Sequence, residues 1–267
     1  MKNIVITGGT RGIGHGLATE FLRRNCNVVI TGRDQQQVDG VVAKLGEQFG
    51  ADKIAGTRCE ITSADDLAAL WSFAADAMGS VDVWINNAGM SIARKPLHEQ
   101  SAADIEAIVQ TNLTGTLLAS KVALAGMHTQ GSGQVWNMEG FGSGDQVAPG
   151  MAAYGATKRA VTYLNKALQK EVKDSPVQVC TLSPGIVVTD LLIGDYDLQS
   201  AEWQKAKKIM NILGDKVETV TPYLADGILK AGKSGDKVAW LTVPKAFGRF
   251  MTAGFNKRDL FADIPGA

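Results

Sequence analysis

Short apolar runs rich in β-branched residues alternate along this chain with longer stretches that have helical spacing. The runs cover residues 3–7, 27–31, 52–59, 81–86, 133–138, 177–183 and 237–243. Continuous apolar strands separated by helices are typical of a parallel sheet buried on both faces, and right-handed crossovers place the helices on the two faces in turn. The pattern therefore predicts an α/β fold: a single doubly wound, Rossmann-like parallel sheet with helices on both faces.

The expected helices lie between these strands. They begin near Gly12, run up to Gln48, cover 65–78, fill a long zone over about 101–128, and cover 154–173. No internal repeat or Pro/Gly-rich linker divides the 267 residues, so we expect one dinucleotide-binding domain over 1–267. Within it we expect a small substrate flap with one helix at 191–213 and a C-terminal extension at 244–267.

Charge and cysteine content argue against several classes of protein. Lys plus Arg equals Asp plus Glu, at 27 each, so no basic excess predicts nucleic acid as a partner. Cys26, Cys59 and Cys180 are far apart, with neither metal-ligand spacing nor a disulfide framework. We therefore expect buried, reduced thiols and no metal site.

The start of the chain bears on its location. Met1 is followed almost directly by the first strand, and no apolar run reaches the ~20 residues of a membrane span. We expect a cytoplasmic location if the protein is bacterial, and a plastid location if a transit peptide has been removed.

A glycine-rich turn follows the first strand. Gly8, Gly12 and Gly14 in ITGGTRGIGHG (6–16) form a G-x-x-x-G-x-G pattern, which suits a tight turn, close approach of the backbone to a pyrophosphate, and close packing of helix on strand. The amino terminus of the next helix offers free N–H groups and a partial positive charge to phosphates. The turn predicts dinucleotide binding; a purely structural turn is the alternative.

The end of the second strand indicates which dinucleotide. An NAD-preferring site places a carboxylate there, but the sequence reads VVITGRD, with Gly32 in that place and Arg33 next. Arg11 of the glycine turn can approach the same corner, and two guanidinium groups suit a 2′-phosphate. We therefore predict NADPH. Two solvated surface arginines are the alternative, and Asp34, which follows at once, leaves a swapped preference open.

Five motifs with compatible spacing give a family resemblance. They are TGGTRGIG (7–14), NNAG (86–89), Asn112 in NLTG, YGATK (154–158) and SPGIVVT (183–189). Together they resemble the short-chain dehydrogenase/reductase family over residues 1 to about 190. The resemblance implies a nicotinamide-dependent oxidoreductase, and a homodimer or homotetramer joined through the helices near 112–128 and 154–173.

Tyr154 and Lys158 can be argued from chemistry as well. Four residues apart on a helix, they share one face. Carbonyl reduction needs an acid for the developing alkoxide, and a nearby ammonium lowers the pKa of a phenol, which is ordinarily near 10. We predict Tyr154 as the proton donor, tuned by Lys158, and the resemblance adds Asn112 as support for a water-linked proton path. An ordinary helix surface is the alternative.

The resemblance also implies which residues hold the cofactor. Asn86 and Asn87 are expected to bridge neighbouring strands, and Glu60 stands where the family usually has Asp. The implied cofactor residues are Gly8, Thr10, Arg11, Gly12, Ile13, Gly14, Arg33, Glu60, Ile61, Asn87, Ala88, Gly89, Tyr154, Lys158, Pro184, Gly185, Val187 and Thr189.

One catalytic position departs from the family pattern. A serine should stand three residues after Asn137, but Gly140 occupies that place, and the interval from Asn137 to Tyr154 is one residue longer than usual. Three explanations stay open. Ser143 supplies the hydroxyl, backbone N–H groups of 140–142 bind the substrate oxygen, or the enzyme is inactive.

The altered loop points to a narrower resemblance. NMEGFGSG, followed by AAYGATKRAV and LSPGIVVTDLL, is similar to the chlorophyll b reductase branch of the family. That branch uses NADPH to reduce the 7-formyl group of chlorophyll b to hydroxymethyl, a step in chlorophyll catabolism. The predicted substrate is therefore a formyl tetrapyrrole or another carbonyl compound. The alternatives are a general ketone or aldehyde reductase and a catalytically silent dinucleotide-sensing or pigment-binding protein.

Two C-terminal segments allow more than one interpretation. In 191–213, Trp203, Ile209, Met210 and Leu213 have near-helical spacing and could face a ligand or pack in the core. Residues 244–261 mix phenylalanines with Lys and Arg, which suits contact with a membrane surface, cover for the sheet edge, or a subunit contact.

Overall fold

The computed structural model describes residues 1–194 and 196–264, and its centre is a seven-stranded parallel sheet. The strand order is β3-β2-β1-β4-β5-β6-β9. The strands are β1 (Asn3–Ile6), β2 (Asn27–Gly32), β3 (Ile54–Arg58), β4 (Val83–Asn86), β5 (Gly133–Met138), β6 (Val177–Ser183) and β9 (Lys237–Ala239). From β1 to β3 each new strand is added toward one edge of the sheet, and from β4 onward toward the other edge. A doubly wound fold requires this change between β1 and β4, so the predicted fold class is confirmed.

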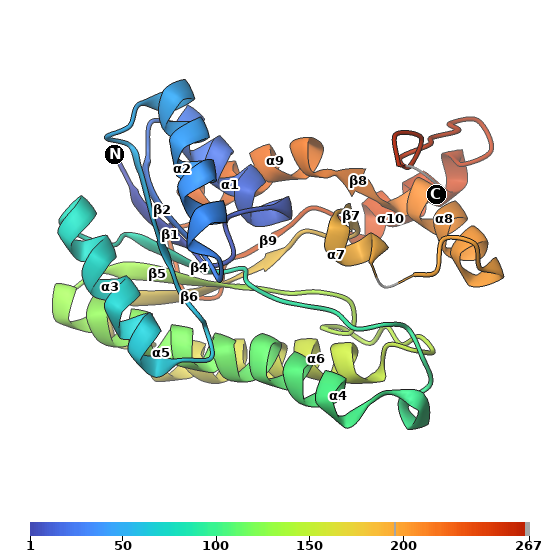
Figure 1. Cartoon of the computed structure of the whole chain (residues 1–267), viewed down its shortest axis with the longest axis horizontal. Coiled ribbons are helices and arrows are strands. Elements are labelled where there is room, and N and C mark those ends of the chain that lie inside the picture. Colours follow the sequence, from blue (N-terminus) through green and yellow to red (C-terminus); the bar gives the residue numbers. More distant parts are fainter. Residues whose placement is uncertain (195, 265–267) are drawn as a thin grey trace.

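Helices cover both faces of this sheet (Figure 1). On one face lie α1 (Gly12–Arg23), α2 (Gln35–Phe49) and α9 (Val217–Lys230). On the other lie α3 (Ala64–Met78), α4 (Ala102–Val109), α5 (Thr116–Gln130) and α6 (Ala152–Glu171). Smaller elements are a 3₁₀ turn (Leu97–Glu99), a π-helix (Gln110–Gly115), α7 (Asp190–Ile193), α8 (Ala201–Leu213) and α10 (Val243–Thr252).

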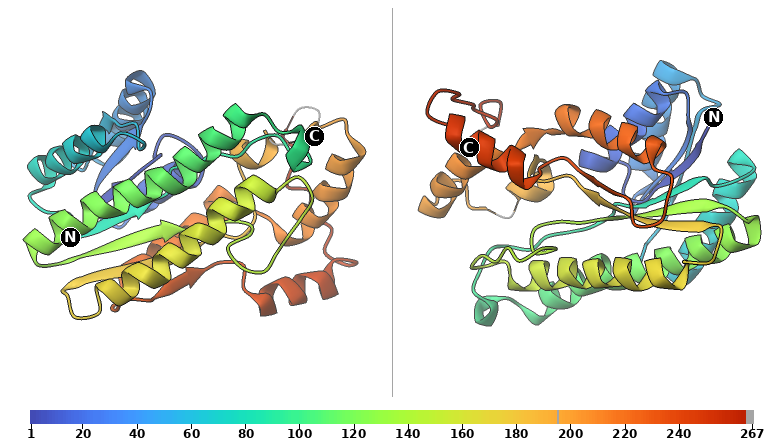
Figure 2. Two further views of the ribbon diagram at one scale, coloured as in Figure 1. Left: turned by 90° about the horizontal axis from the view of Figure 1, so that it is seen from below. Right: turned by 180° about the vertical axis from the view of Figure 1, so that it is seen from behind.

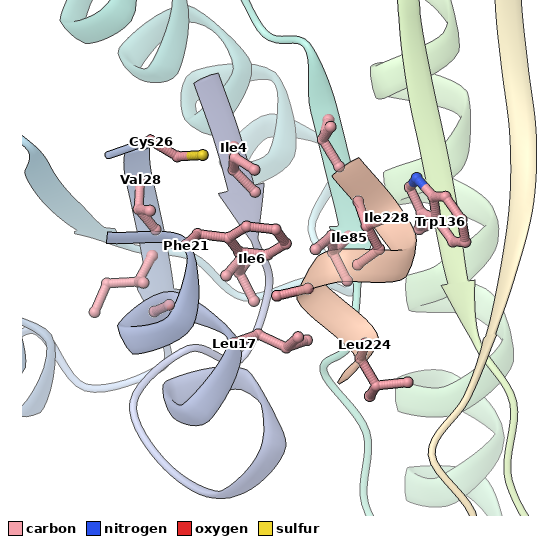
Figure 3. Close-up of a cluster of buried hydrophobic side chains, with 14 of the residues drawn as sticks. Ile4, Ile6, Leu17, Phe21, Cys26, Val28, Ile85, Trp136, Leu224 and Ile228 are labelled. Carbon is pink, nitrogen blue, oxygen red and sulfur yellow. The ribbon is translucent and has the colours of Figure 1, made fainter. Parts of the chain in front are cut away.

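Alternation along the strands divides the core into two layers. Ile4 and Ile6 of β1 pack against α1 and α9, together with Phe21 and Leu224, whereas Val5 between them points to the opposite layer. Figure 3 shows the first layer. All these side chains are fully buried, and burial of this kind stabilises the fold by about 1.5–3 kcal/mol for each large apolar side chain.

A separate cluster joins the flap to the C-terminal extension. Trp203 of α8 lies edge-on to Phe261, with ring centroids 5.0 Å apart, and both are fully buried. Both views of Figure 2 place α8 and α10 at one end of the molecule. A two-stranded parallel sheet of β7 (Val187–Val188) and β8 (Asp215–Lys216) joins the segments just before and just after the flap. The predicted division into one domain, flap and extension stays a prediction, and its residues 195 and 265–267 lie outside the described residues.

Several predicted boundaries were wrong. The last strand ends at Ala239, not at 243, because Trp240 turns to donate a hydrogen bond from Nε1 to Asp215 (2.6 Å) and Thr242 caps α10. The long zone over 101–128 is two α-helices joined by the π-helix. Neither α9 nor the two-stranded sheet was predicted from the sequence. In the described part of the chain, no helix combines the length and the apolar character needed to cross a bilayer.

Candidate active site

A cavity of about 800 Å³ opens along the carboxyl ends of the strands. Its walls come from the turn after β1, the ends of β2 and β3, the segment after β4, the loop after β5, the start of α6, and the segment from Pro184 to α8. A ligand site is expected at this edge of a doubly wound sheet.

The glycine turn exposes the amino terminus of α1 to the cavity. Gly8 and Gly12 have φ of 67° and 56°, the left-handed region that glycine adopts without strain. Arg11 is the N-cap residue but makes no side-chain cap bond, and the first turn of α1 carries no acidic residue. Its N–H groups and partial positive charge can therefore face an anion.

Asn87 fixes the shape of this turn. Its Nδ2 donates to the carbonyl oxygens of Thr7 (3.0 Å) and Gly8 (2.9 Å). Gly14 does not line the cavity; it lies behind the turn, where a Cβ would come 2.5 Å from the same Nδ2.

The end of β2 brings Gly32, Arg33 and Asp34 to the wall of the cavity. A Cβ at Gly32 would come 2.9 Å from Thr10 Cγ2, so a side chain there would crowd this corner of the site. Arg33 lines the cavity and is exposed. The carboxylate of Asp34 accepts hydrogen bonds from the N–H groups of Gln36 (2.9 Å) and Gln37 (3.4 Å), which makes it the N-cap of α2.

At the end of β3, Glu60 lines the cavity but folds its carboxylate back onto Thr62, whose hydroxyl donates to it at 3.1 Å. Asp66 instead accepts from the Glu60 N–H at 2.9 Å. This bond, with Ser63 and Arg58, lowers the pKa of Asp66. Ile61, from the same segment, also lines the cavity.

Tyr154 and Lys158 lie together at the start of α6. The Lys158 Nζ is 5.8 Å from the centroid of the Tyr154 ring. The Tyr154 Oη and the Lys158 Cε are 2.6 and 3.2 Å from one point, the position of a Cβ built on Gly140. Both side chains line the cavity. The Tyr154 hydroxyl and the Lys158 side chain therefore lie close together in the cavity.

Burial controls the charge of Lys158. The residue is 7% exposed, and its Nζ donates to the carbonyl oxygen of Met138 at 3.3 Å. Desolvation lowers the pKa of Lys158 to about 8, and the carboxylate of Glu139 opposes this by favouring the ammonium form. The lysine is therefore mainly charged at neutral pH.

Glu139 is a buried acid, not a solvated loop residue. Its side chain is 8% exposed and forms an ion pair with Lys237 of β9 at 2.6 Å. Its backbone N–H donates to Leu182 of β6 at 2.7 Å. Glu139 also lines the cavity. Its ion pair therefore connects the loop after β5 to β9, the edge strand of the sheet.

Asn112 lies in the π-helix, a rare element that often marks functional positions. Its amide pairs with the backbone of Met90, donating to the carbonyl (2.9 Å) and accepting from the N–H (2.8 Å). Its backbone carbonyl accepts from Thr116 Oγ1 (2.8 Å). Asn112 is 1% exposed and does not line the cavity, so it contacts the site through Met90 and Thr157.

Ser143 takes a position different from the one expected of a substrate-binding hydroxyl. It is 6% exposed and does not line the cavity. Its Oγ accepts from the Gly140 N–H (3.1 Å) and donates to the Lys158 carbonyl (3.3 Å). These contacts favour a role in holding the loop against α6, and direct contact with substrate stays an untested prediction.

A chain of buried side-chain amides links the strands next to the site. Asn86 Nδ2 donates to Asn137 Oδ1 (2.7 Å), and Asn137 Nδ2 donates to Asn165 Oδ1 (2.7 Å). Trp84 and Thr181 complete the chain at 2.8 and 3.2 Å. The bridging predicted for Asn86 is therefore present and joins β4, β5, α6 and β6. The bridging predicted for Asn87 is made instead to Thr7 and Gly8, after β1.

The other end of the cavity is mainly apolar. Ile209 and Met210 of α8 line it, whereas Trp203 packs in the core and Leu213 is not among the lining residues. Met90, Arg94, Phe141 and Met151 also line the cavity and were not predicted from the sequence, whereas Leu191, Leu192, Tyr196 and Ala206 lie in the predicted flap. Several of them follow the ends of strands, which was the one signal available.

Most predicted cofactor residues share this cavity. Those that line it are Gly8, Thr10, Arg11, Gly12, Ile13, Arg33, Glu60, Ile61, Asn87, Ala88, Gly89, Tyr154, Lys158, Pro184, Gly185, Val187 and Thr189. Gly14, Asn112 and Ser143 lie behind its wall. The roles of all these residues stay predictions.

The C-terminal extension has an exposed apolar face. Val243, Phe247, Met251 and Phe255 are at least two-thirds exposed, while Phe261 is buried. Arg249 and Arg258 both bind Asp215, at 2.8 and 3.0 Å, and α10 packs near α8. The membrane and subunit interpretations stay predictions.

Comparison with known proteins places these features in context. A family model described as short chain dehydrogenase matches residues 2–197. Chlorophyll(ide) b reductase NOL, chloroplastic, of Arabidopsis thaliana is 39% identical over 259 residues, which cover 94% of this chain and 73% of that protein. Probable chlorophyll(ide) b reductase NYC1, chloroplastic, of Oryza sativa subsp. japonica is 38% identical over 268 residues, covering 94% of this chain and 52% of that protein.

Solved structures agree on the fold. The structure titled ElxO with NADP Bound has a TM-score of 0.75 and 26% identity, covering 89% of this chain and 97% of that one. A closed form of serine dehydrogenase complexed with NADP+ has a TM-score of 0.77 at 21% identity, covering 90% and 95%.

Proposed function

The chain belongs to the short-chain dehydrogenase family of oxidoreductases, and on that premise we propose that it is an NADPH-dependent carbonyl reductase. We further propose that its substrate is the 7-formyl group of chlorophyll b or a related formyl tetrapyrrole, which it reduces to hydroxymethyl. The names of its plant relatives support this substrate class.

The observation that carries the proposal is the meeting of Tyr154 and Lys158 inside the cavity. The Tyr154 hydroxyl donates its proton to the carbonyl oxygen as negative charge develops on that oxygen. The Lys158 ammonium stabilises the resulting phenolate, because an adjacent positive charge favours an anion in a poorly solvated site. Asn112 holds the segment after β4 beside them through Met90.

The residues around the glycine turn fit a nicotinamide dinucleotide. When bound, the reduced cofactor supplies the hydride that reaches the carbonyl carbon. The open amino terminus of α1 would hold the pyrophosphate. Arg33 and Arg11 would hold a 2′-phosphate, while Asp34 accepts the cap bonds of α2 through its Oδ1.

The first experiment tests catalysis. Purified protein with NADPH and chlorophyll b should yield 7-hydroxymethyl chlorophyll, and Tyr154→Phe should lower the rate by about a hundredfold to ten-thousandfold, since it removes the acid. Tyr163→Phe is the control, because Tyr163 lies on the same helix and is 76% exposed. Turnover of simple aldehydes alone would indicate a general reductase. Tight NADPH binding without any turnover would indicate a silent sensor.

A second experiment tests the choice of cofactor. Arg33→Ala should raise the KM for NADPH by about tenfold to a hundredfold, the size of a lost charge-assisted hydrogen bond, and change the KM for NADH little. Lys44→Ala, an exposed cation on α2 outside the cavity, is the control. Equal effects on both cofactors would refute the assignment.

Assembly and location are proposals of the same kind. We propose a homodimer or homotetramer through α5 and α6, supported by the exposed Leu117 and Tyr163 on these helices. The chloroplastic relatives support a plastid location if a transit peptide has been removed; a bacterial protein would be cytoplasmic.

A further inference from the structure

Arg94 introduces a positive charge into the apolar end of the cavity. It follows β4 by eight residues and lines the cavity beside Met90, Met151 and Tyr196. Its neighbour across the chain is Gly150, where a Cβ would come 3.2 Å from the carbonyl carbon of Arg94. The segment that bears Arg94 is therefore closely packed, which limits how far the side chain can be displaced.

The guanidinium group of Arg94 lacks an anionic partner among the described residues. It stacks on the ring of Tyr196, 4.3 Å from the centroid, and makes no ion pair in the described part of the chain. Its Nε is buried and has no hydrogen-bond partner there. A buried N–H donor is stabilised by an acceptor, so a ligand oxygen placed here would be bound favourably.

Among the described residues, the carboxylates that line the cavity each have another neighbour. Glu139 binds Lys237, Asp190 lies 3.9 Å from Arg11, Asp34 caps α2, and Glu60 accepts from Thr62. None of these four carboxylates forms an ion pair with Arg94. A planar fork of N–H donors in apolar surroundings matches a carboxylate, which accepts two parallel hydrogen bonds.

We propose that Arg94 binds a carboxylate of the substrate, so that this enzyme prefers carbonyl compounds that also carry a free acid. The inference rests on the proposed reductase function and narrows it. Among formyl tetrapyrroles it selects chlorophyllide b, which has a free propionate, over chlorophyll b, in which that propionate is esterified.

The test compares chlorophyllide b with its methyl ester, two pigments that differ only at the carboxylate. The wild-type protein should have a KM about tenfold to a hundredfold lower for the acid. Arg94→Gln should remove that preference by raising the KM for the acid to that for the ester, and Arg94→Lys should restore part of it. Lys95→Gln is the control, because this exposed neighbouring cation does not line the cavity.

Two further measurements separate this inference from the proposed function. Pigment binding is followed by quenching of tryptophan fluorescence, so the preference is measured even if no pigment is reduced. Turnover of para-carboxybenzaldehyde is compared with that of its methyl ester, which detects the same preference in a general reductase. Equal affinity of the wild-type protein for acid and ester overturns the inference.

A purely structural role for Arg94 gives a different result. If Arg94 only holds Tyr196 and the flap, Arg94→Gln should raise the KM for acid and ester alike and lower the Tm. The inference instead requires Arg94→Gln to raise the KM for the acid selectively, because the variant removes the guanidinium group that would bind the carboxylate.

Discussion

Gly140 shows how one residue can decide whether a catalytic group fits. Its position is the one at which the family pattern has serine, yet a Cβ there would come 2.6 Å from the Tyr154 Oη and 3.2 Å from the Lys158 Cε. The hydroxyl of the tyrosine occupies the space that a side chain at 140 would need. Glycine at this position is therefore part of the site's geometry and does not by itself indicate a lost activity.

This geometry predicts that restoring the family's serine is harmful. Gly140→Ser should lower kcat by about tenfold to a hundredfold, because overpacking of this kind costs about 1–3 kcal/mol and displaces Tyr154, the proposed proton donor. The measurement is steady-state reduction of a formyl substrate at fixed NADPH.

Gly144→Ser is the matched control for that variant. It lies in the same loop, but a Cβ there would meet the flexible end of Gln146, with the nearest atom at 2.8 Å. Gly144→Ser should leave kcat within about twofold of the wild-type value, since the Gln146 side chain can adopt another rotamer. A Gly140→Ser enzyme as active as the wild type would show that the tyrosine has room to move.

At the scale of elements, local signals located most helices and strands but not their irregular ends. Ser63 and Asp34 cap α3 and α2 through bonds that span two or three residues, so sequence can indicate those starts. The π-helix around Asn112 has no such local signature. Its extra residue per turn accompanies the pairing of Asn112 with Met90, which lies 22 residues earlier in the chain.

The last strand shows the same limit. KVAWLTV has the apolar, β-branched composition of a strand, and the sequence predicts one over 237–243. Only Thr181, Leu182 and Ser183 of β6 pair with β9. The Trp240 N–H still bonds to Ser183, and its indole Nε1 donates to Asp215. Composition could not reveal a partner 25 residues away.

At the scale of the whole molecule, the fold brings together three charges from distant segments. Glu139 follows β5, Lys237 begins β9, and Lys158 lies on α6. Glu139 and Lys237 are 98 residues apart but form an ion pair at 2.6 Å, and the same carboxylate favours the charged form of Lys158. The charge of Lys158 therefore depends on contacts between distant strands of the sheet.

This arrangement predicts a change in pH dependence. Burial lowers the pKa of Lys158 to about 8, and Glu139 acts in the opposite direction. Removing that carboxylate in Glu139→Gln should lower the pKa further, so the ammonium form is lost at lower pH. The alkaline limb of the kcat/KM profile should then move toward lower pH.

The control for this prediction is Asp145→Asn, which removes an acid that is 98% exposed in the same loop. Its alkaline limb should coincide with that of the wild type, because solvent screens an exposed charge. If Glu139→Gln also leaves the limb in place, Lys158 is not the group that controls it.

The sequence by itself determined the sheet, the glycine turn and the Tyr154–Lys158 pair, because each follows from a short-range rule: strand alternation, backbone freedom at glycine, or the four-residue repeat of a helix. Only the tertiary structure decided that Glu139 is buried against Lys237, that Ser143 faces the loop backbone, and that Arg94 stacks on Tyr196. These contacts join segments that are far apart in the sequence. Their proximity depends on how the whole chain packs, so no local sequence pattern predicts them.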